Sequence, residues 1–431
     1  MKNIIILLTL IILNINHVQA VTLKEALNQA FINNLELNAE RENLKISKEE
    51  LKISKSNYLP SFILSGSKSR EETNKLTNRD GSNATITNVD PEIKTFKVEQ
   101  TLVDFGRSAD YEKNIIGIEI AEAKLIKKEQ EIIYKAIAAY SGLVLANKKI
   151  IINQRNINLL ERQVETDSIR LERGQVSISD LAQSQSSLAG AQAQYIQAKN
   201  DLITFQLSYE NVIGKNADTS NLEIGLNAIA NIPLSLNESI DLSKNNSPDL
   251  IIAKLEFNQS KQDVQIAKSD LKPSADLSFE RTYSDDLSST VDEREKDVLK
   301  ATITWPFFSG GKNRATLNKN KNLKTRKELL FKSTKTTNET NVASAWSNLQ
   351  TSKSFLNSVR SQVKSAEIAY EGITADYERG SGRTTLEVIQ SNTLLLNSQL
   401  SLASSERNYL LAQYNLLKAI GLLSSKYLKL Q

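Results

Sequence analysis

Hydrophobic residues along this chain follow two spacings, and each spacing predicts a different element. Over long segments they recur three, four or seven positions apart, which is the heptad rhythm of helices packed along a seam. Over four short segments they alternate with polar residues, as in a half-buried strand. The clearest helical seams are Ile126, Ile133, Ile137, Tyr140, Val144 and Ile151, and then Ile389, Leu396, Leu400, Ala403, Leu410, Tyr414 and Leu417.

The predicted helices are much longer than those of ordinary globular domains. Segments of about 66 residues, near 108–173 and 313–379, contain no proline and would form rods of roughly 100 Å at 1.5 Å per residue. A rod of that length needs a partner along its whole side. The shorter predicted helices, 23–57, 177–212 and 236–271, supply partners, and Pro60 and Pro273 end the first helix of each half.

The four alternating segments predict strands at about 61–70, 94–103, 274–283 and 298–306, with long polar loops at 71–92 and 284–297. Strands of about 9 or 10 residues have the length that a tilted bilayer-spanning strand requires. Aromatic residues gather where the strands end, as an interfacial aromatic belt would. These residues are Phe105, Trp305, Phe307 and Phe308.

Period-2 patterning does not say whether lipid or protein buries the apolar face, so a soluble β-tip on a coiled coil is an alternative. Four strands cannot close a barrel, and open strand edges do not occur in lipid. If the strands cross a membrane, the chain must therefore oligomerise. Two chains would supply about 8 strands and three chains about 12.

The sequence contains an internal duplication. Residues 21–214 can be laid over residues 234–421, and Leu171-Glu172-Arg173-Gly174 then corresponds to Tyr377-Glu378-Arg379-Gly380. The repeats are joined by a linker at 215–233 and followed by a tail at 422–431. Residues 1–20 have a positive start, an apolar run and small residues at positions −3 and −1, which predicts a cleaved secretory signal. The apolar run is too short for a spanning helix.

Composition excludes several function classes. The 431 residues carry a net charge of +4, no Cys, and one His that lies inside the predicted signal. Disulfides, thiolate nucleophiles and histidine chemistry are therefore not expected, nor are a metal site or a cofactor. The sequence has neither a Gly-rich phosphate loop nor a nucleophile elbow, so an enzyme is not expected. Interspersed charges of both signs argue against a nucleic-acid partner.

Three motifs resemble the TolC family of outer-membrane efflux and secretion channels: Val103-Asp104-Phe105-Gly106-Arg107, Phe307-Phe308-Ser309-Gly310-Gly311-Lys312, and Tyr377-Glu378-Arg379-Gly380 leading to Arg383. The resemblance implies a mainly α fold with a small β part, in which duplicated coiled-coil hairpins carry four membrane strands per chain. It further implies a homotrimer whose 12-stranded β-barrel joins an α-helical barrel in the periplasm.

The resemblance also implies site residues at the periplasmic tip. Arg383 and Tyr377 match a gate latch that binds Asp180, while Glu387 and Gln390 match the pore constriction. The two turns match adaptor contacts, with one extra residue in the second turn: Gly174, Gln175, Val176, Gly380, Ser381 and Gly382. Simpler interpretations exist. Gly174 and Gly380 suit ordinary helix C-termini, Asp180 suits a helix cap, and Arg383 and Glu387 suit an i,i+4 pair.

The function that the resemblance implies is a passive exit duct in the Gram-negative outer membrane. An inner-membrane transporter of the RND or ABC type would supply it through a periplasmic adaptor, also called a membrane fusion protein. The alternative is a soluble periplasmic coiled-coil scaffold or adaptor. The cargo and the identity of the adaptor do not follow from the sequence.

Overall fold

The structure is a computed structural model, and it describes residues 22–74, 88–217, 232–288 and 291–430. The predicted signal and most of the predicted linker lie outside these residues. The described chain divides into two compact units. One contains the described residues within Met1–Arg41, Lys124–Leu250 and Lys335–Gln431, and the other contains those within Glu42–Ala123 and Ile251–Thr334.

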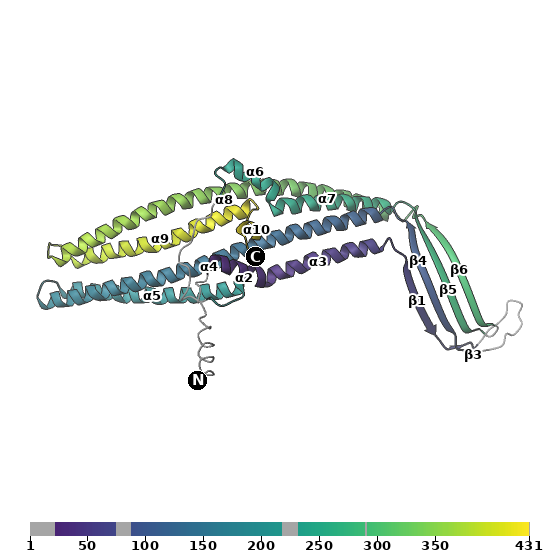
Figure 1. Cartoon of the computed structure of the whole chain (residues 1–431), viewed down its shortest axis with the longest axis horizontal. Coiled ribbons are helices and arrows are strands. Elements are labelled where there is room, and N and C mark those ends of the chain that lie inside the picture. Colours follow the sequence, from purple (N-terminus) through teal and green to yellow (C-terminus); the bar gives the residue numbers. More distant parts are fainter. Residues whose placement is uncertain (1–21, 75–87, 218–231, 289–290, 431) are drawn as a thin grey trace, which may run out of the picture. The chain divides into compact units, whose positions relative to one another are not determined.

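Helices dominate both halves of the chain (Figure 1). The helices of the first half are α2 (Leu23–Asn33), α3 (Leu35–Ser56), α4 (Arg107–Glu172) and α5 (Ile178–Ile213). Those of the second half are α6 (Leu236–Asn246), α7 (Pro248–Ser269), α8 (Lys312–Glu378), α9 (Thr385–Ala419) and α10 (Ser425–Leu428). Within the described residues, no helix combines the length and the apolar character that a bilayer crossing requires.

The first helix of each half is broken, which the helical periodicity did not predict. Asn34 ends α2 in an extended conformation, its side chain donates to the Val212 carbonyl at 2.9 Å, and it accepts from the Leu37 amide at 3.1 Å. Ser247 separates α6 from α7 in the second half. It precedes Pro248, whose ring disfavours the helical conformation in the residue before it. The predicted continuous helices at 23–57 and 236–271 are therefore wrong at these points.

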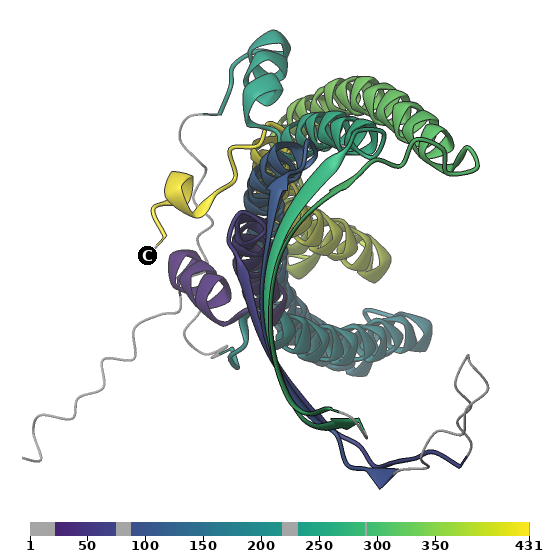
Figure 2. The same ribbon diagram turned by 90° about the vertical axis from the view of Figure 1, so that its right-hand side faces the viewer.

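A four-stranded antiparallel sheet has the order β1-β4-β5-β6 and curves visibly in Figure 2. Its strands are β1 (Ser61–Lys68), β4 (Glu92–Val103), β5 (Ser274–Ser288) and β6 (Val291–Thr304). The central β4–β5 ladder joins the two halves of the chain, with Val98 opposite Phe279. The edge strands of this sheet are β1 and β6.

The polar segments predicted as long loops are partly strand. β5 and β6 pair out to Ser288 and Val291, and β2 (Glu71–Glu72) pairs with β3 (Asn88–Val89). These segments were predicted as loops because they are rich in charged residues. The hydrogen bonds between strands join backbone groups, however, and do not require apolar side chains. Opposite charges on neighbouring strands stabilise the pairing further. Arg281 on β5, for example, donates to Glu295 on β6 at 3.1 Å.

One face of the sheet is apolar and uncovered. The register places Phe62, Val98, Phe279 and Leu299 in one row across the four strands. Phe62 is 68% exposed and Leu299 is 72% exposed. A soluble β-tip would pack the apolar sides of its strands on one another, whereas the strands of the main sheet form a single layer. This face needs a partner outside the chain.

The main hydrophobic core lies among the helices of the first unit. It is built around Tyr140, Ile137, Leu416 and Leu417, each no more than 1% exposed. The predicted seam on α9 is buried at Leu396, Ala403, Leu410, Tyr414 and Leu417. On α4 the centre of the predicted seam is buried, whereas its two ends, Ile126 and Ile151, are exposed.

Candidate functional site

In the turn between α4 and α5, helix α4 ends at a glycine in the left-handed backbone conformation. Gly174 has φ +70°, a conformation that costs glycine little because it lacks a Cβ. The Gln175 amide donates to the Arg170 carbonyl at 2.8 Å, and the Gly174 amide donates to the Leu171 carbonyl at 2.9 Å. These two bonds satisfy carbonyls that the end of a helix leaves free.

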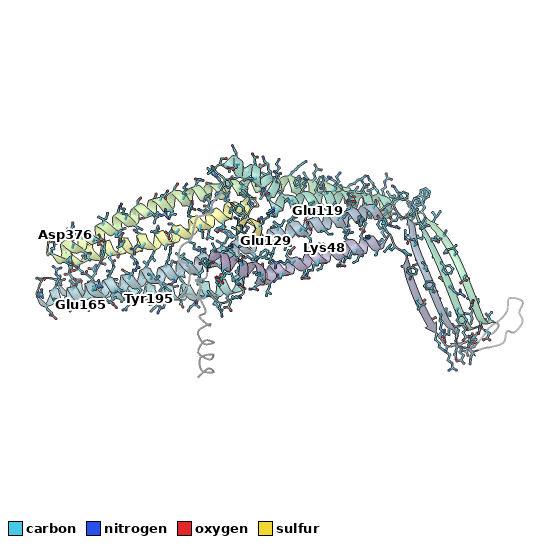
Figure 3. All side chains as sticks on the ribbon, in the orientation of Figure 1. Lys48, Glu119, Glu129, Glu165, Tyr195 and Asp376 are labelled. Atoms are coloured by element: carbon cyan, nitrogen blue, oxygen red, sulfur yellow. The ribbon has the colours of Figure 1, made fainter. Side chains whose placement is uncertain are left out.

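The turn between α8 and α9 repeats this geometry and then lengthens it. Gly380 has φ +77°, and the Ser381 amide donates to the Asp376 carbonyl at 3.0 Å. Gly382 adds a second left-handed residue at φ +83°. Figure 3 marks Glu165 on α4 and Asp376 on α8, close to the two hairpin turns. Of the six predicted adaptor-contact residues, Val176 is half-buried and the others are exposed.

Asp180 lies in the first turn of α5 and forms a capping box with Ser177. Its carboxylate accepts from the Ser177 amide at 2.9 Å and from the Ser177 hydroxyl at 2.7 Å, while Ser177 in turn caps the Asp180 amide. The pKa of the Asp180 carboxyl is lowered, because the Ser177 hydroxyl and amide both donate to it. Within the chain, Asp180 therefore fills the structural role that the sequence left open as the alternative.

Glu387 caps α9 in the same way. Its carboxylate accepts from the Thr384 amide at 2.8 Å and from the Arg383 guanidinium at 3.0 Å. These contacts lower the pKa of the Glu387 carboxyl, the Thr384 amide contributing most and Arg383 next. Arg383 also approaches Asp376 at 3.9 Å. Gln390, the other predicted constriction residue, is exposed.

The structure does not bring Asp180, Tyr377 and Arg383 together within one chain. Tyr377 is 2% exposed, and its hydroxyl donates to Asp167 on α4 at 2.5 Å. The same hydroxyl lies 2.9 Å from the hydroxyl of Thr385. Asp167, rather than Asp180, is thus the carboxylate that holds the tyrosine inside the chain.

Asp167 is fully buried and gathers donors from three helices. Gln163 donates from α4 at 2.9 Å, Ser184 donates from α5, and Tyr377 donates from α8. Through Tyr377 the network also reaches Thr385, the first residue of α9. Buried carboxylates persist only when hydrogen bonds replace the lost water. This cluster therefore ties the α4–α5 hairpin to the α8–α9 hairpin.

Arg170 completes the surroundings of Tyr377. Its guanidinium lies 4.1 Å above the centre of the Tyr377 ring, and it donates to the Tyr377 carbonyl at 3.1 Å. The pKa of the Tyr377 hydroxyl is raised, first because burial disfavours the phenolate and next because the hydroxyl donates a hydrogen bond to Asp167. At neutral pH the tyrosine therefore remains a donor.

Sequence reasoning missed Asp167, although a signal was present. Ile157, Leu160 and Asp167 occupy one side of α4, since they are three and seven positions apart, and Ile157 and Leu160 are core residues. A carboxylate at a seam position must be hydrogen-bonded when the helix packs. Nearby, Asn392 on α9 donates to Asn156 on α4 at 2.8 Å, so the hairpins share a second buried polar contact.

The predicted aromatic belt lies at the helix end of the sheet. Trp305 and Phe307 pack edge to face with ring centres 5.6 Å apart, and the Trp305 indole donates to the Leu271 carbonyl at 3.2 Å. Lys272 lies 4.5 Å above the ring of Phe105. Phe307 and Phe308 are each 82% exposed. Exposed aromatic rings beside an apolar sheet face suit a membrane–water interface.

The profile of one protein family, described as "Outer membrane efflux protein", matches the chain over residues 26–215 and again over residues 239–422. The chain belongs to this family. The two matched segments together cover most of its length, and each contains two of the four strands of the main sheet.

Individual similar proteins share low sequence identity with this chain, but the similarity extends over most of both chains. The outer membrane efflux protein BepC of Brucella suis is 24% identical over 95% of this chain and 87% of its own length. The outer membrane protein TolC of Escherichia coli is 22% identical over 95% of this chain and 84% of its own. The crystal structure of the Campylobacter jejuni CmeC outer membrane channel superposes with a TM-score of 0.81 at 18% identity, covering 93% and 85% of the two chains.

Family membership gives the general function. The protein is an outer-membrane efflux or secretion channel of the TolC family, and it is a transporter rather than an enzyme. Its long paired helices and four antiparallel strands form the fold of these channels.

Proposed function

We propose that three copies of the chain form one closed channel, in which three four-stranded sheets make a 12-stranded barrel continuous with a tunnel of paired helices. The observation that carries this proposal is the sheet itself. It has two open edges, β1 and β6, and an apolar face that the chain leaves exposed. Open edges are not tolerated in lipid, and pairing β6 of one copy with β1 of the next removes them.

The proposed channel is a passive duct. An inner-membrane transporter would supply the energy, and a periplasmic adaptor would join the transporter to the exposed turns at Gly174–Val176 and Gly380–Gly382. Their left-handed glycines present bare backbone at the ends of the hairpins, which allows the close approach of a partner helix pair. Cargo selection would then rest mainly with the transporter.

We place the gate at the same end of the hairpins. Because Asp167 already holds Tyr377 inside the chain, the exposed Arg383 would bind Asp180 of a neighbouring copy. A directional arginine–carboxylate pair suits a latch that a competing partner can release. Glu387 and Gln390 would line the constriction. Glu387 is partly neutralised by Arg383 within the chain, so moving Arg383 to the neighbouring Asp180 would strengthen the negative field at the constriction.

The assembly is tested by purifying the protein from detergent-solubilised outer membranes and measuring its mass by light scattering, with correction for bound detergent. We expect a mass of about three protomers, because the closed barrel needs about 12 strands. A monomer or dimer recovered from the aqueous fraction without detergent would overturn the channel assembly and favour a periplasmic scaffold.

The gate is tested by Arg383→Ala in planar bilayers. Removing the guanidinium should raise single-channel conductance, because the tips lose their bond to the neighbouring copy. Arg379→Ala is the matched control, since it removes an exposed arginine of the same turn that is not part of the proposed latch. Equal conductance in the wild type and in a trimeric Arg383→Ala variant would contradict the latch.

A further inference from the structure

The first helix of each repeat is broken at the same place. Asn34 separates α2 from α3, and Ser247 separates α6 from α7. In both repeats a helix of 11 residues is followed by one of 22 residues. Each break also lies close to a glycine with positive φ, Gly214 in the first repeat and Gly421 in the second. The two breaks are therefore equivalent positions of the internal duplication.

At the first break, one side chain bridges two helix ends. The Asn34 side chain donates to the Val212 carbonyl near the end of α5 at 2.9 Å. It also accepts from the Leu37 amide in the first turn of α3 at 3.1 Å. A carboxamide can do both because it carries a donor and an acceptor. It thus satisfies a carbonyl and an amide that the ends of the two helices leave free.

The second break lacks this bridge. Ser247 is 3% exposed, and its hydroxyl forms no hydrogen bond with any residue that the structure describes. Ala419 precedes Ile420-Gly421 as Val212 precedes Ile213-Gly214, so the Ala419 carbonyl is the equivalent acceptor. Within the described part of the chain, no side chain donates to it. The serine side chain is shorter than that of asparagine and does not reach across the joint.

A cavity of about 490 Å³ lies at this second joint. It is lined by α4, α8, the end of α9 and the start of α7, and all the lining residues belong to the first compact unit. Ser247 and Ala419 are among them. A water molecule occupies about 30 Å³ in the liquid. The cavity therefore has room for a molecule of many atoms.

Buried polar side chains line the cavity and have hydrogen-bonding capacity that the chain does not use. Asn338 is 7% exposed and donates from its amide nitrogen to the Ser243 hydroxyl at 2.9 Å, but no described residue donates to its side-chain oxygen. Gln130 is 3% exposed and donates to the Gly421 carbonyl at 2.9 Å, and its oxygen likewise has no donor in the described chain. Buried polar atoms nearly always have a partner. Here the partner must come from outside the chain.

The rest of the lining suits a polar ligand without net charge. Two positive and two negative side chains balance one another: Lys127, Glu131, Asp249 and Lys418. Lys127 and Asp249 are paired at 2.7 Å. Further carboxamides come from Asn341, Asn348 and Asn415. The lining formed by the described residues contains no aromatic ring, so it offers no flat apolar surface for a ring to stack on.

We propose that this cavity binds a small polar molecule through a primary carboxamide, which takes the position that the Asn34 side chain holds at the first joint. The carboxamide nitrogen donates to the Ala419 carbonyl and to the Asn338 side-chain oxygen, and the carboxamide oxygen accepts from the Ser247 hydroxyl. The other polar groups of the ligand contact the asparagine amides and the balanced charges of the lining. Glutamine, either free or as a residue of a short peptide, has this chemistry.

Ligand-observed NMR on the protein purified in detergent tests the site, with L-glutamine as the probe and L-glutamate as its matched control. Glutamate has nearly the same size, but its carboxylate cannot donate to the Ala419 carbonyl and brings a net charge into a neutral lining. We expect glutamine to bind, and glutamate to bind about tenfold more weakly.

A second probe, N-acetylglutamine methylamide, identifies the source of the carboxamide, because it lacks the charges of a free amino acid. If it binds as tightly as glutamine, a residue within a peptide supplies the group. If it binds more weakly than glutamine but more tightly than glutamate, the free amino acid is the better ligand. Both results support a carboxamide site.

Ser247→Asn tests the site from the side of the protein. The introduced carboxamide should bridge the joint as Asn34 does, so glutamine should bind about tenfold more weakly, and the midpoint of thermal unfolding should not fall. Ser347→Asn is the matched control, since Ser347 is exposed on α8 and does not line the cavity. It should bind glutamine like the wild type. Asn338→Leu removes the free oxygen at similar volume and should also weaken binding about tenfold.

Three results would overturn the proposal. Equal affinity for glutamine and glutamate would exclude recognition of the carboxamide. Wild-type affinity in Ser247→Asn and Asn338→Leu proteins that are folded by circular dichroism would place the binding elsewhere. No binding of either glutamine probe would mean that water alone fills the cavity. None of these results depends on the mass of the assembly, so this site and the channel proposed above are tested separately.

Discussion

At the scale of single residues, the hydrogen bond between Tyr377 and Asp167 joins the two hairpins. Because the carboxylate is fully buried, losing one donor leaves part of its hydration unreplaced. A double-mutant cycle with Tyr377→Phe and Asp167→Asn should therefore give a coupling free energy of about 1.5 to 3 kcal/mol. Guanidinium unfolding followed by circular dichroism measures it. Tyr370→Phe on the same helix is the control, and a coupling of zero would mean that the two side chains act independently.

The capping carboxylates predict how the tips respond to acid. The folded pKa values of Asp180 and Glu387 lie below their unfolded values, so their caps stabilise the helix starts at neutral pH. That stability is lost as the pH falls from the unfolded pKa through the lower folded pKa of each carboxyl. Hydrogen exchange at Ser177–Asp180 and Thr384–Glu387 should therefore show less protection at pH 3 than at pH 5, after correction for intrinsic rates. In Asp180→Asn combined with Glu387→Gln this pH dependence should disappear.

At the scale of elements, the hairpin turns depend on glycine backbone. Gly382 has φ +83°, so Gly382→Ala should destabilise the α8–α9 turn by roughly 1 to 2 kcal/mol. Gly190 lies inside α5, and no neighbouring atom lies within 4 Å of the place that an alanine Cβ would occupy. Gly190→Ala should therefore stabilise the protein by about 0.5 to 1 kcal/mol. Opposite shifts in the midpoint of thermal unfolding would confirm the distinction, and a stabilising Gly382→Ala would contradict it.

Element boundaries also show how far the sequence could lead. Heptad spacing predicted α4 and α8 to within one residue at each end, because the seam repeats locally for their whole length. The break at Asn34 was missed because it depends on a hydrogen bond to Val212, 178 residues away. The Ser247–Pro248 break did have a local signal, the proline itself. Likewise, the resemblance pointed to Asp180, whereas only three-dimensional packing could bring Asp167 to Tyr377.

At the scale of the whole molecule, the two tryptophans report on different structures. Trp346 packs against the helical core, and Trp305 follows strand β6. The helical hairpins join residues close in sequence, whereas Val98 pairs with Phe279 across 181 positions (279 − 98). Refolding into detergent should therefore change the fluorescence of Trp346 in the Trp305→Phe variant before that of Trp305 in the Trp346→Phe variant. Simultaneous changes would show that the sheet and the hairpins fold as one cooperative unit.

The β4–β5 ladder also sets an order of events during biosynthesis. A chain is made from its N-terminus, so β1 and β4 exist before β5 has been synthesised. Until β5 arrives, β4 exposes an unpaired edge and an apolar face that includes Phe96 and Val98. Such a hairpin is prone to aggregate. We therefore expect the newly made first half to need protection by chaperones until the second half has been synthesised.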